Sequence, residues 1–281
     1  MKVGIIGLGL IGGSLAKDLG KLGFATGLIG VDSSEKHCKK ALELKLVDEI
    51  QDLETAIQKS DMLIICTPVD VICSLLPGIL DNIAGSSKVV VDMGSTKADI
   101  SRLVKNHPGR GRYVAVHPMA GTEFSGPEAA IDRLFKGKQA IICDHESSDA
   151  DALNLVRNML ETLEMKVSLM PAEDHDIHVA YVSHISHITS FALALSVLDK
   201  EKDEDSILSL AAGGFESTVR LAKSNSRTWT PIFLHNAVPV LEVIDNYLEK
   251  IQLFRNAISA GDAVQLQELM EEANKIKKIL K

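Results

Sequence analysis

Three short apolar segments end in side chains that could do chemistry: Thr67 with Pro68, then Ser95, then His117. His117 is the best acid–base candidate, because an unperturbed histidine pKa of about 6.5 suits proton removal at neutral pH. If the segments are parallel strands, their carboxyl ends meet at the sheet edge where doubly wound folds bind ligands. The sequence therefore predicts a catalytic cleft that contains His117; a histidine that only caps or packs is the alternative.

A glycine-rich turn near the start of the chain predicts a dinucleotide site. It follows a short apolar segment and leads into a helical pattern. Gly7 permits the turn, Gly9 lets a pyrophosphate approach the backbone, and Gly12 lets the helix pack on the strand. The helix begins near Leu10 and Ile11, where free N–H groups and the positive end of the dipole would face the phosphates.

The identity of the cofactor depends on Asp32, which ends the second predicted strand, residues 27–31. An acidic residue about 20–25 positions past the glycines hydrogen-bonds the adenosine ribose and repels a 2′-phosphate. The sequence therefore predicts NAD rather than NADP, with Thr67 and Pro68 near the nicotinamide. A glycine turn that binds no nucleotide is the alternative.

The order of the predicted elements positions these residues. Apolar strands alternate with helical patterns as far as residue 171, and the pattern is helical from residue 172 onward. This order predicts an α/β, Rossmann-type doubly wound sheet in residues 1–171 and an all-helical substrate and dimerisation domain in residues 172–281. The C-terminal helices are expected at residues 172–199, 206–225, 230–259 and 262–280, with Pro239 bending the third because it removes a backbone hydrogen bond.

Composition excludes several classes of function. The net charge of −8 argues against nucleic acid and anionic membranes as partners. We find no apolar run of the roughly 18 residues that a membrane span needs, and no signal peptide. The four cysteines form no CxxC pair, which is typical of reduced thiols in a cytoplasmic protein. The long apolar helical faces predict a homodimer, with a monomeric bundle as the alternative.

Four histidines in residues 172–199 raise the question of a metal site. At about 100° per residue, His175 and His178 should lie opposite His184 and His187. One four-histidine site is therefore not expected, no cysteine or carboxylate pattern completes a smaller one, and we predict no metal. His184 and His187 share a face, so one of them could bind substrate.

Two further side chains of the helical part could border the cleft. Arg220 is a surface arginine by default, but a carboxylate substrate would need a cation from this part of the chain, and arginine binds carboxylates in a bidentate manner. Trp229 is the only tryptophan. Packing in the core and lining the site are equally open interpretations for it.

Over essentially its whole length, the chain resembles the prephenate/arogenate dehydrogenases of tyrosine biosynthesis. The matching segments are residues 7–14 with Asp32, 66–68, 94–97, 117–123, 174–176, 183–187 and 218–222 with Trp229. The resemblance implies that His117 acts on the ring hydroxyl of the substrate with help from Ser95. It also implies that His187 and Arg220 hold polar groups of the substrate, and that Thr122, Glu123 and Trp229 border the pocket.

Two positions depart from the family pattern. Many members carry an aspartate where this chain has Ser217, and the usual proline of the 183–187 segment is Ser186. Ser217 should lie near the substrate side chain, where a neutral residue favours prephenate over arogenate. Glu216 is an acidic residue next to Ser217, but helical spacing turns its side chain about 100° away from that of Ser217.

The resemblance implies NAD-dependent oxidative decarboxylation of prephenate to 4-hydroxyphenylpyruvate. We expect no fused mutase segment before Met1 and no regulatory domain after residue 281. Arogenate or dual cyclohexadienyl dehydrogenase activity is the nearest alternative. A β-hydroxyacid-type dehydrogenase would place a catalytic lysine on a glycine-rich helix, and we find no such segment. A non-catalytic NAD sensor would not need Ser95, His117, His187 and Arg220 together.

Overall fold

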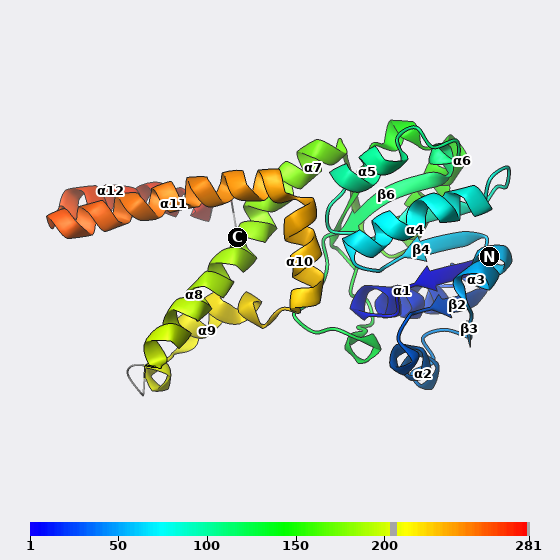
Figure 1. Cartoon of the computed structure of the whole chain (residues 1–281), viewed down its shortest axis with the longest axis horizontal. Helices are drawn as coiled ribbons and strands as arrows, with labels where there is room; N and C mark the ends of the chain where they lie inside the picture. The colour runs from blue at the N-terminus through cyan, green and yellow to red at the C-terminus, as the bar shows by residue number, and fades with distance from the viewer. Residues whose placement is uncertain (203–206, 280–281) are drawn as a thin grey trace. The chain divides into compact units, whose positions relative to one another are not determined.

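The computed structural model describes residues 1–202 and 207–279 (Figure 1). The chain forms two compact units, Met1–Asn236 and Ala237–Lys281, and each is described by itself. The boundary predicted between residues 171 and 172 falls inside the first unit and stays a prediction.

A sheet of eight strands among the described residues forms the centre of the first unit. Its order is β3-β2-β1-β4-β5-β6-β7-β8, and neighbouring strands are parallel except for the antiparallel pair β6 and β7. The predicted α/β doubly wound class is confirmed. The strand order reverses between β1 and β4, which is where such sheets bind ligands. The strands are β1 (Lys2–Ile6), β2 (Gly27–Val31), β3 (Glu49–Ile50), β4 (Met62–Ile65), β5 (Val89–Asp92), β6 (Tyr113–Pro118), β7 (Gln139–Cys143) and β8 (Lys166–Met170).

Helices cover both faces of this sheet. Strand β4 is buried along its whole length, as expected for a parallel strand between two helical layers. Side chains of α1, α2 and α6 pack in one core cluster, and those of α3, α4 and α5 pack in the other. These helices are α1 (Leu10–Lys21), α2 (Glu35–Glu43), α3 (Leu53–Lys59), α4 (Val69–Asn82), α5 (Ala98–Val104) and α6 (Ala150–Thr162).

Three short elements, β3, α3 and α5, had no counterpart in the sequence prediction. Helix α3 carries a local signal, because the Asp52 side chain accepts the backbone N–H of Thr55 at 2.8 Å and caps the helix. Helix α5 instead begins at a carboxylate that is distant in sequence: Asp176 accepts the backbone N–H groups of Lys97 and Ala98. Its start could not be inferred from local sequence.

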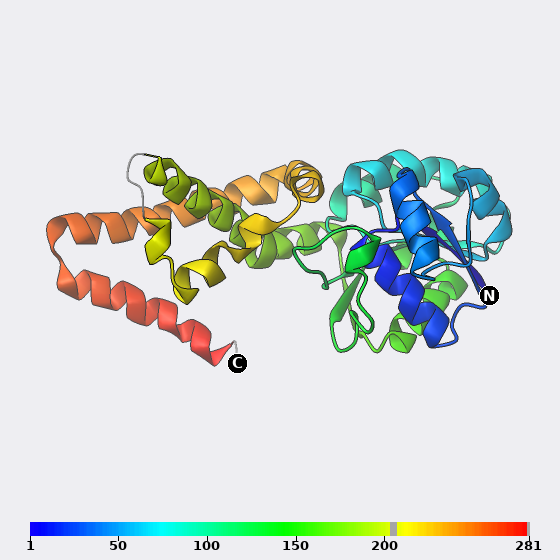
Figure 2. The same cartoon turned by 90° about the horizontal axis from the view of Figure 1, so that it is seen from below.

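The long helix predicted at residues 172–199 is continuous but not uniform. It consists of α7 (Ala172–Val179), a π turn (Ala180–His184) and α8 (Ile185–Glu201), and Figure 2 shows its course. The π turn widens the helix and changes the direction of every side chain that follows it.

The helix predicted at residues 206–225 is wrong for the part that the structure describes. It contains a 3₁₀ turn (Leu208–Leu210), the short α9 (Gly213–Val219) and another 3₁₀ turn (Arg220–Lys223); residue 206 lies outside the described residues. Glycines at the start of α9 and the lack of a continuous apolar face account for the interruption.

The single helix predicted at residues 230–259 is two helices. Helix α10 (Ser226–His235) ends at Asn236, whose backbone leaves the helical region, and α11 (Ala237–Ala260) begins the second unit. Pro239 therefore lies in the first turn of α11, where no intrahelical N–H bond is lost, and the predicted bend there is wrong.

In the second unit, α11 is followed by a tight turn and α12 (Ala263–Ala273). Gly261 adopts φ +65°, and the Asp262 side chain accepts the N–H of Gln265 at 2.9 Å. A 3₁₀ turn, Asn274–Lys278, follows α12, so the helix predicted at residues 262–280 ends early within the described residues.

One helical segment, Ala172–Glu201, is long and apolar enough by length and composition to cross a membrane, with a mean hydropathy of 1.3 in its best window. The expectation that no segment reaches this length is therefore wrong. The first half of the segment carries buried polar side chains, including His175, Asp176 and His184, that bond within the first unit. The prediction of no membrane partner stays untested.

Candidate active site

Steric crowding explains two of the three glycines in the turn after β1. Gly7 adopts φ +95°, and a Cβ atom there would lie 2.8 Å from the Cys66 carbonyl group. A Cβ atom on Gly12 would lie 1.9 Å from the Gly7 oxygen, so helix and strand approach closely at this point. Gly9 has open space within 4 Å of its Cβ position. This is the space through which a pyrophosphate would reach the backbone.

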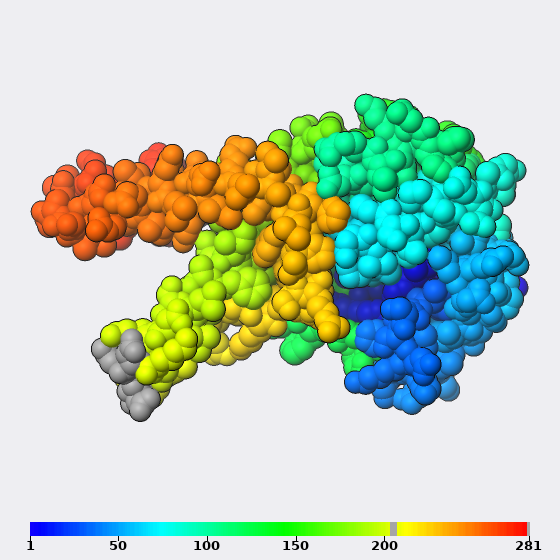
Figure 3. Space-filling view, viewed as in Figure 1, coloured from blue at the N-terminus to red at the C-terminus, as the bar shows by residue number. Residues whose placement is uncertain are grey.

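The N-terminus of α1 provides the positive end of this site. Its N-cap is Gly9, which has no side chain to occupy the first N–H groups, and Leu10 and Ile11 follow. Helical geometry leaves those N–H groups without intrahelical acceptors, and they favour an anion. In the space-filling view, dark-blue α1 lies recessed between cyan α4 and blue α2 (Figure 3).

Asp32 follows β2 and joins it to the glycine turn. One carboxylate oxygen accepts the N–H of Leu8 at 2.8 Å, and the other accepts the N–H of Ser34 at 2.8 Å. The imidazole Nδ1 of His37 lies 3.4 Å from Oδ2. The side chain is 11% exposed, so an acceptor remains at the surface of the turn for ribose hydroxyls.

Thr67 and Pro68 lie on the other side of the switch point, after β4. The Thr67 Oγ1 atom is buried and has no hydrogen-bond partner within the described residues. Buried hydroxyl groups are nearly always hydrogen-bonded, and a bound ligand can supply the hydrogen-bond partner here. Together with the glycine turn, the α1 N-terminus and Asp32, this hydroxyl fits a nicotinamide dinucleotide.

His117 lies at the carboxyl end of β6 and remains partly exposed. Its Nδ1 lies 2.8 Å from Nε2 of His175, with the two rings edge to face. Burial lowers the pKa of His117 well below its usual value, and His175, Lys97 and His184 lower it further. His117 is therefore neutral at neutral pH and able to accept a proton.

Ser95 lies in the loop after β5, and a buried network fixes that loop. The ammonium group of Lys97 is fully buried and pairs with Asp92. Asp92 also accepts the N–H of Gly94 at 2.8 Å and the hydroxyl of Tyr113 at 2.6 Å. Since both ends of the loop are held, the partly exposed Ser95 between them has a defined position at the same sheet edge as His117.

The helices after β8 contribute three side chains, His187, Arg220 and Trp229. The rings of His187 and Trp229 stack with centroids 3.4 Å apart, and His187 Nδ1 donates to the Ser183 carbonyl at 3.1 Å. Burial lowers the pKa of His187, with a smaller contribution from Arg220. Arg220 lies 3.5 Å from Glu123 and is 54% exposed. The cation is thus weakly paired and open to a ligand.

Two of the predicted substrate contacts have only local bonds. The hydroxyl of Thr122 accepts the N–H of Phe124 at 3.3 Å, and the hydroxyl of Ser217 donates to the Gly214 carbonyl at 2.9 Å. Both side chains are exposed. Within the described ranges, neither has a bond to His117.

The prediction that His175 lies opposite His184 is wrong. Both are buried, whereas His178 is exposed. The intervening π turn advances less than 100° per residue, which brings the two rings toward the same side. Asn236 connects the two regions by donating to the Asp176 carbonyl at 2.7 Å and to His184 Nδ1 at 3.1 Å.

Sequence reasoning did not select His175, Asp176 or Asn236 as functional residues. Their proximity depends on the π turn and on the α10 terminus, and neither has a local sequence signal. Residues 1–202 and 207–279 contain no group of three His, Cys, Asp or Glu side chains that could hold a metal ion, and the expectation of no metal stays a prediction.

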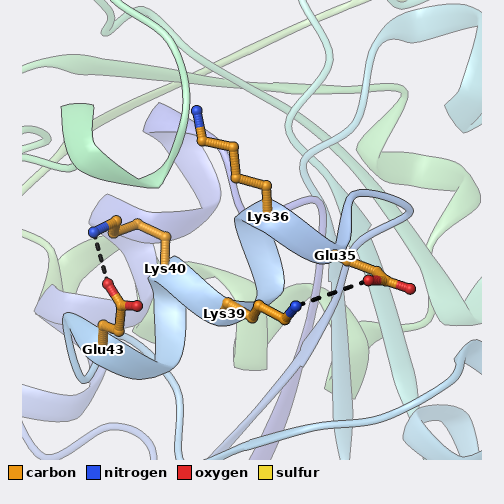
Figure 4. A pocket seen from close by; sticks show the side chains of 5 residues that line it. All are labelled: Glu35, Lys36, Lys39, Lys40 and Glu43. Atoms are coloured by element: carbon orange, nitrogen blue, oxygen red, sulfur yellow. Dashed lines mark hydrogen bonds and ion pairs between the residues drawn. The ribbon is translucent and has the colours of Figure 1, made fainter.

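A surface hollow on α2 is a separate feature. Its lining residues all come from that helix: Glu35, Lys36, Lys39, Lys40 and Glu43 (Figure 4). Lys40 pairs with Glu43 at 2.6 Å, and Lys39 lies 4.0 Å from Glu35. The hollow contains none of the predicted site residues.

This fold and site define an NAD-dependent dehydrogenase, with the dinucleotide features at the β1/β4 switch point and a neutral histidine at the same sheet edge. Two family models match the chain: "Prephenate dehydrogenase, nucleotide-binding domain" over residues 15–169 and "Prephenate dehydrogenase, dimerization domain" over residues 171–272. The chain belongs to the prephenate dehydrogenase family.

Individual relatives agree with this placement. The cyclohexadienyl dehydrogenase of Zymomonas mobilis is 30% identical over 99% of this chain and 96% of its own length. The prephenate dehydrogenase of Bacillus subtilis is 30% identical over 93% of this chain and 71% of its own length. The crystal structure of Aquifex aeolicus prephenate dehydrogenase, in complex with hydroxyphenyl propionate and NAD+, superposes with a TM-score of 0.87 at 30% identity, covering 99% of this chain and 97% of that one.

Proposed function

We propose that this chain catalyses the NAD-dependent oxidative decarboxylation of prephenate to 4-hydroxyphenylpyruvate in tyrosine biosynthesis. The observation that carries the proposal is the neutral His117 at the end of β6, on the sheet edge that holds the glycine turn. The family membership of both parts of the chain supports the same reaction.

The residues of this chain supply a base and an oriented substrate. His117 accepts the hydroxyl proton at C4 of the ring while the C4 hydride departs and CO2 leaves C1. Bound NAD supplies the hydride acceptor. The ring becomes aromatic, so the step is strongly downhill, and the protein mainly positions the reacting groups.

The proposed binding residues hold either the cofactor or the substrate. Gly7, Gly9, Leu10, Ile11, Gly12, Asp32, Thr67 and Pro68 hold the cofactor. Arg220 binds carboxylate or keto oxygens of the substrate, because a guanidinium donates to such oxygens. His187 holds a polar group of the substrate through Nε2, which is the acceptor nitrogen because Nδ1 donates to the Ser183 carbonyl. Thr122, Glu123, Ser217 and Trp229 border the pocket, and Ser95 supports His117.

Arogenate or dual activity is the second candidate, since one relative is a cyclohexadienyl dehydrogenase. Ser217 is neutral, and Glu216 lies 4.0 Å from Lys223, so Glu216 has a counter-ion of its own. With no unpaired carboxylate at Ser217 to attract an ammonium group, prephenate is the better substrate.

We also propose a cytoplasmic homodimer. The region matched by the dimerization model exposes apolar side chains on α8, with Leu195 at 61% and Leu198 at 50% exposure. Burying such residues against a second copy would be favourable. Sedimentation of the intact chain should give twice the monomer mass of 30.4 kDa.

NADH formation tests the reaction directly. The purified chain is offered prephenate and arogenate, each with NAD and with NADP, and the product is identified by chromatography. We expect 4-hydroxyphenylpyruvate and NADH from prephenate with NAD. Bound NAD without turnover of either substrate would favour the sensor, and turnover of β-hydroxyacids alone would favour the other dehydrogenase class.

A further inference from the structure

Three side chains form a hydrogen-bonded row that ends at His117. Asp176 Oδ1 lies 2.7 Å from His175 Nδ1, and His175 Nε2 lies 2.8 Å from His117 Nδ1. His175 is completely buried and Asp176 is 2% exposed, whereas His117 is partly exposed. The row thus runs from the interior of the first unit to the reacting surface.

The Asp176 end of the row is held firmly. Its two carboxylate oxygens accept the N–H groups of Lys97 and Ala98, each at 2.8 Å, at the start of α5. Its backbone carbonyl accepts a bond from the Asn236 amide at 2.7 Å. These three bonds come from two other elements, so the direction of the carboxylate is fixed independently of His175.

The direction of hydrogen bonding follows from the chemistry of the groups. An ionised carboxylate can only accept, so His175 Nδ1 carries the proton that Asp176 receives. In a neutral imidazole the other nitrogen then has a lone pair, and His175 Nε2 accepts from His117 Nδ1. By the same rule His117 Nε2 has the free lone pair, and it lies on the ring edge away from His175.

We propose that Asp176 and His175 are positioning residues that hold His117 in the tautomer whose Nε2 can take the proton of the substrate hydroxyl. This inference rests on the proposed function, in which His117 is the base. Without the row, either ring nitrogen of His117 could carry the proton, and the Nε2–H form would face the substrate as a donor.

The proton that His117 takes from the substrate is returned to the product within the site. The hydroxyl O–H bond breaks and an N–H bond forms at His117 Nε2, while the C4–H electron pair leaves as hydride and the C1–carboxylate pair enters the ring. The imidazolium then returns its proton to the phenolate oxygen, so the overall reaction releases no proton. Asp176 stabilises the intermediate positive charge through His175.

The charged and titratable groups that act on His117 are His175, Lys97 and His184. Each of the three disfavours a positive charge on His117 when it carries a positive charge itself. His175 is neutral in the row, where it accepts from His117 and is hydrogen-bonded to a carboxylate. The row therefore supplies the compensating negative charge that the imidazolium needs during turnover.

The tautomer can be measured in the resting protein without substrate. Nitrogen-15 spectra of the histidine-labelled full chain distinguish a protonated Nδ1 from a protonated Nε2, and the His117→Asn variant identifies the His117 signals. We expect the Nδ1–H form for His117. A protonated Nε2 in the wild-type protein overturns the proposal, whatever the activity.

Asp176→Asn tests the row through catalysis. With its oxygen in the place of Oδ2, the asparagine still accepts the N–H of Ala98 but loses the bond from Lys97. Its amide then stands in the place of Oδ1 and donates to His175 Nδ1, which reverses the row and protonates His117 Nε2. The corresponding replacement in a serine-protease triad acts in this way. We expect kcat to fall by about 10²–10⁴-fold with KM changed less than about threefold, and the His117 signals to shift to the Nε2–H form.

Asp99→Asn is the matched control, because Asp99 lies in the first turn of α5 and pairs with another histidine, His235, at 2.9 Å. It should leave kcat and the His117 signals unchanged. Near-normal kcat in a folded Asp176→Asn protein overturns the proposal. Wild-type protein that turns over neither prephenate nor arogenate refutes the proposed function instead, and the nitrogen-15 result still decides the tautomer.

Discussion

The carboxylate of Asp32 accepts the backbone N–H of Leu8 at 2.8 Å, across 24 positions of the sequence. The bond ties the end of β2 to the glycine turn that follows β1. The side chain that fixes the turn is therefore also the one that we propose to bind the ribose.

Asp32 should make NAD the preferred cofactor. A 2′-phosphate would meet this carboxylate, so we expect kcat/KM for NAD to exceed that for NADP by at least about tenfold, or about 1.4 kcal/mol. Asp32→Ser should narrow the ratio. Glu35→Ser, at an exposed acid on α2, is the control and should leave the ratio alone. Wild-type protein that uses NADP equally well would refute this role.

Replacing His117 should abolish most of the turnover. His117→Asn removes the base, and we expect kcat to fall by about 10²–10⁴-fold while substrate affinity changes less. His107→Asn is the control, because His107 pairs with Asp81 at 3.3 Å outside the site. Near-normal turnover of His117→Asn would remove this residue from the mechanism.

The pH profile gives a second check on His117. Burial lowers its pKa well below the usual 6.5 of a histidine, and a histidine gains its proton as the pH falls through its pKa. Neutral, active His117 should therefore persist below pH 6.5. The acid limb of kcat/KM for wild-type protein should lie below that pH; a limb centred above it would contradict the assignment.

The cofactor half of the site could be predicted from sequence because its signals are local. Gly7, Gly9 and Gly12 lie within six residues directly after β1, and Asp32 follows the next strand. His117 could be selected because a polar residue at a strand's carboxyl end is a general property of doubly wound sheets.

The other half depends on contacts that no short segment encodes. Asp176 bonds to Lys97 across 79 positions, and His184 faces the same interior as His175 only because of the π turn. Ideal helical spacing placed these histidines on opposite sides. Likewise, the break between α10 and α11 at Asn236 is tied to its bonds with Asp176 and His184 rather than to a proline or glycine.

Arg220 should contribute to substrate binding more than to turnover. Arg220→Lys retains the charge but loses the planar fork, so we expect the KM for prephenate to rise by about tenfold or more with a smaller change in kcat. Arg102→Lys is the control, because Arg102 is an exposed arginine that pairs with Asp99 at 2.8 Å. An unchanged KM for both Arg220→Lys and Arg220→Ala would make Arg220 a surface residue only.

His184 should make the fold sensitive to acid. Burial lowers its pKa to about 4, against about 6.5 in an unfolded chain. Between these values the unfolded chain binds a proton that the folded chain does not, so this contribution to stability is present above pH 6.5 and is lost as the pH falls. At pH 5 the loss is about 2 kcal/mol.

Thermal unfolding at pH 7.5 and pH 5 tests this role. His184→Gln can still accept from Asn236 but does not titrate, so it should reduce the difference in Tm between the two pH values. His145→Gln is the control, because His145 is a partly exposed histidine. It should leave the difference in Tm as it is in the wild type. An unchanged difference in His184→Gln would show that His184 does not cause the acid sensitivity.

Ser217 should set the choice between prephenate and arogenate. Its hydroxyl donates to the Gly214 carbonyl within α9, so the position presents no charge to the substrate side chain. Ser217→Asp introduces a carboxylate that would attract the ammonium group of arogenate by a charge-assisted hydrogen bond and would lie unpaired beside the keto group of prephenate. We expect wild-type protein to prefer prephenate and the variant to shift the ratio of specificity constants toward arogenate.

Thr162→Asp is the control. It adds the same charge on α6, at a hydroxyl with a comparable local hydrogen bond, and should not change the ratio of specificity constants. A wild-type preference for arogenate, or a ratio that Ser217→Asp leaves unchanged, would show that this position does not select the substrate.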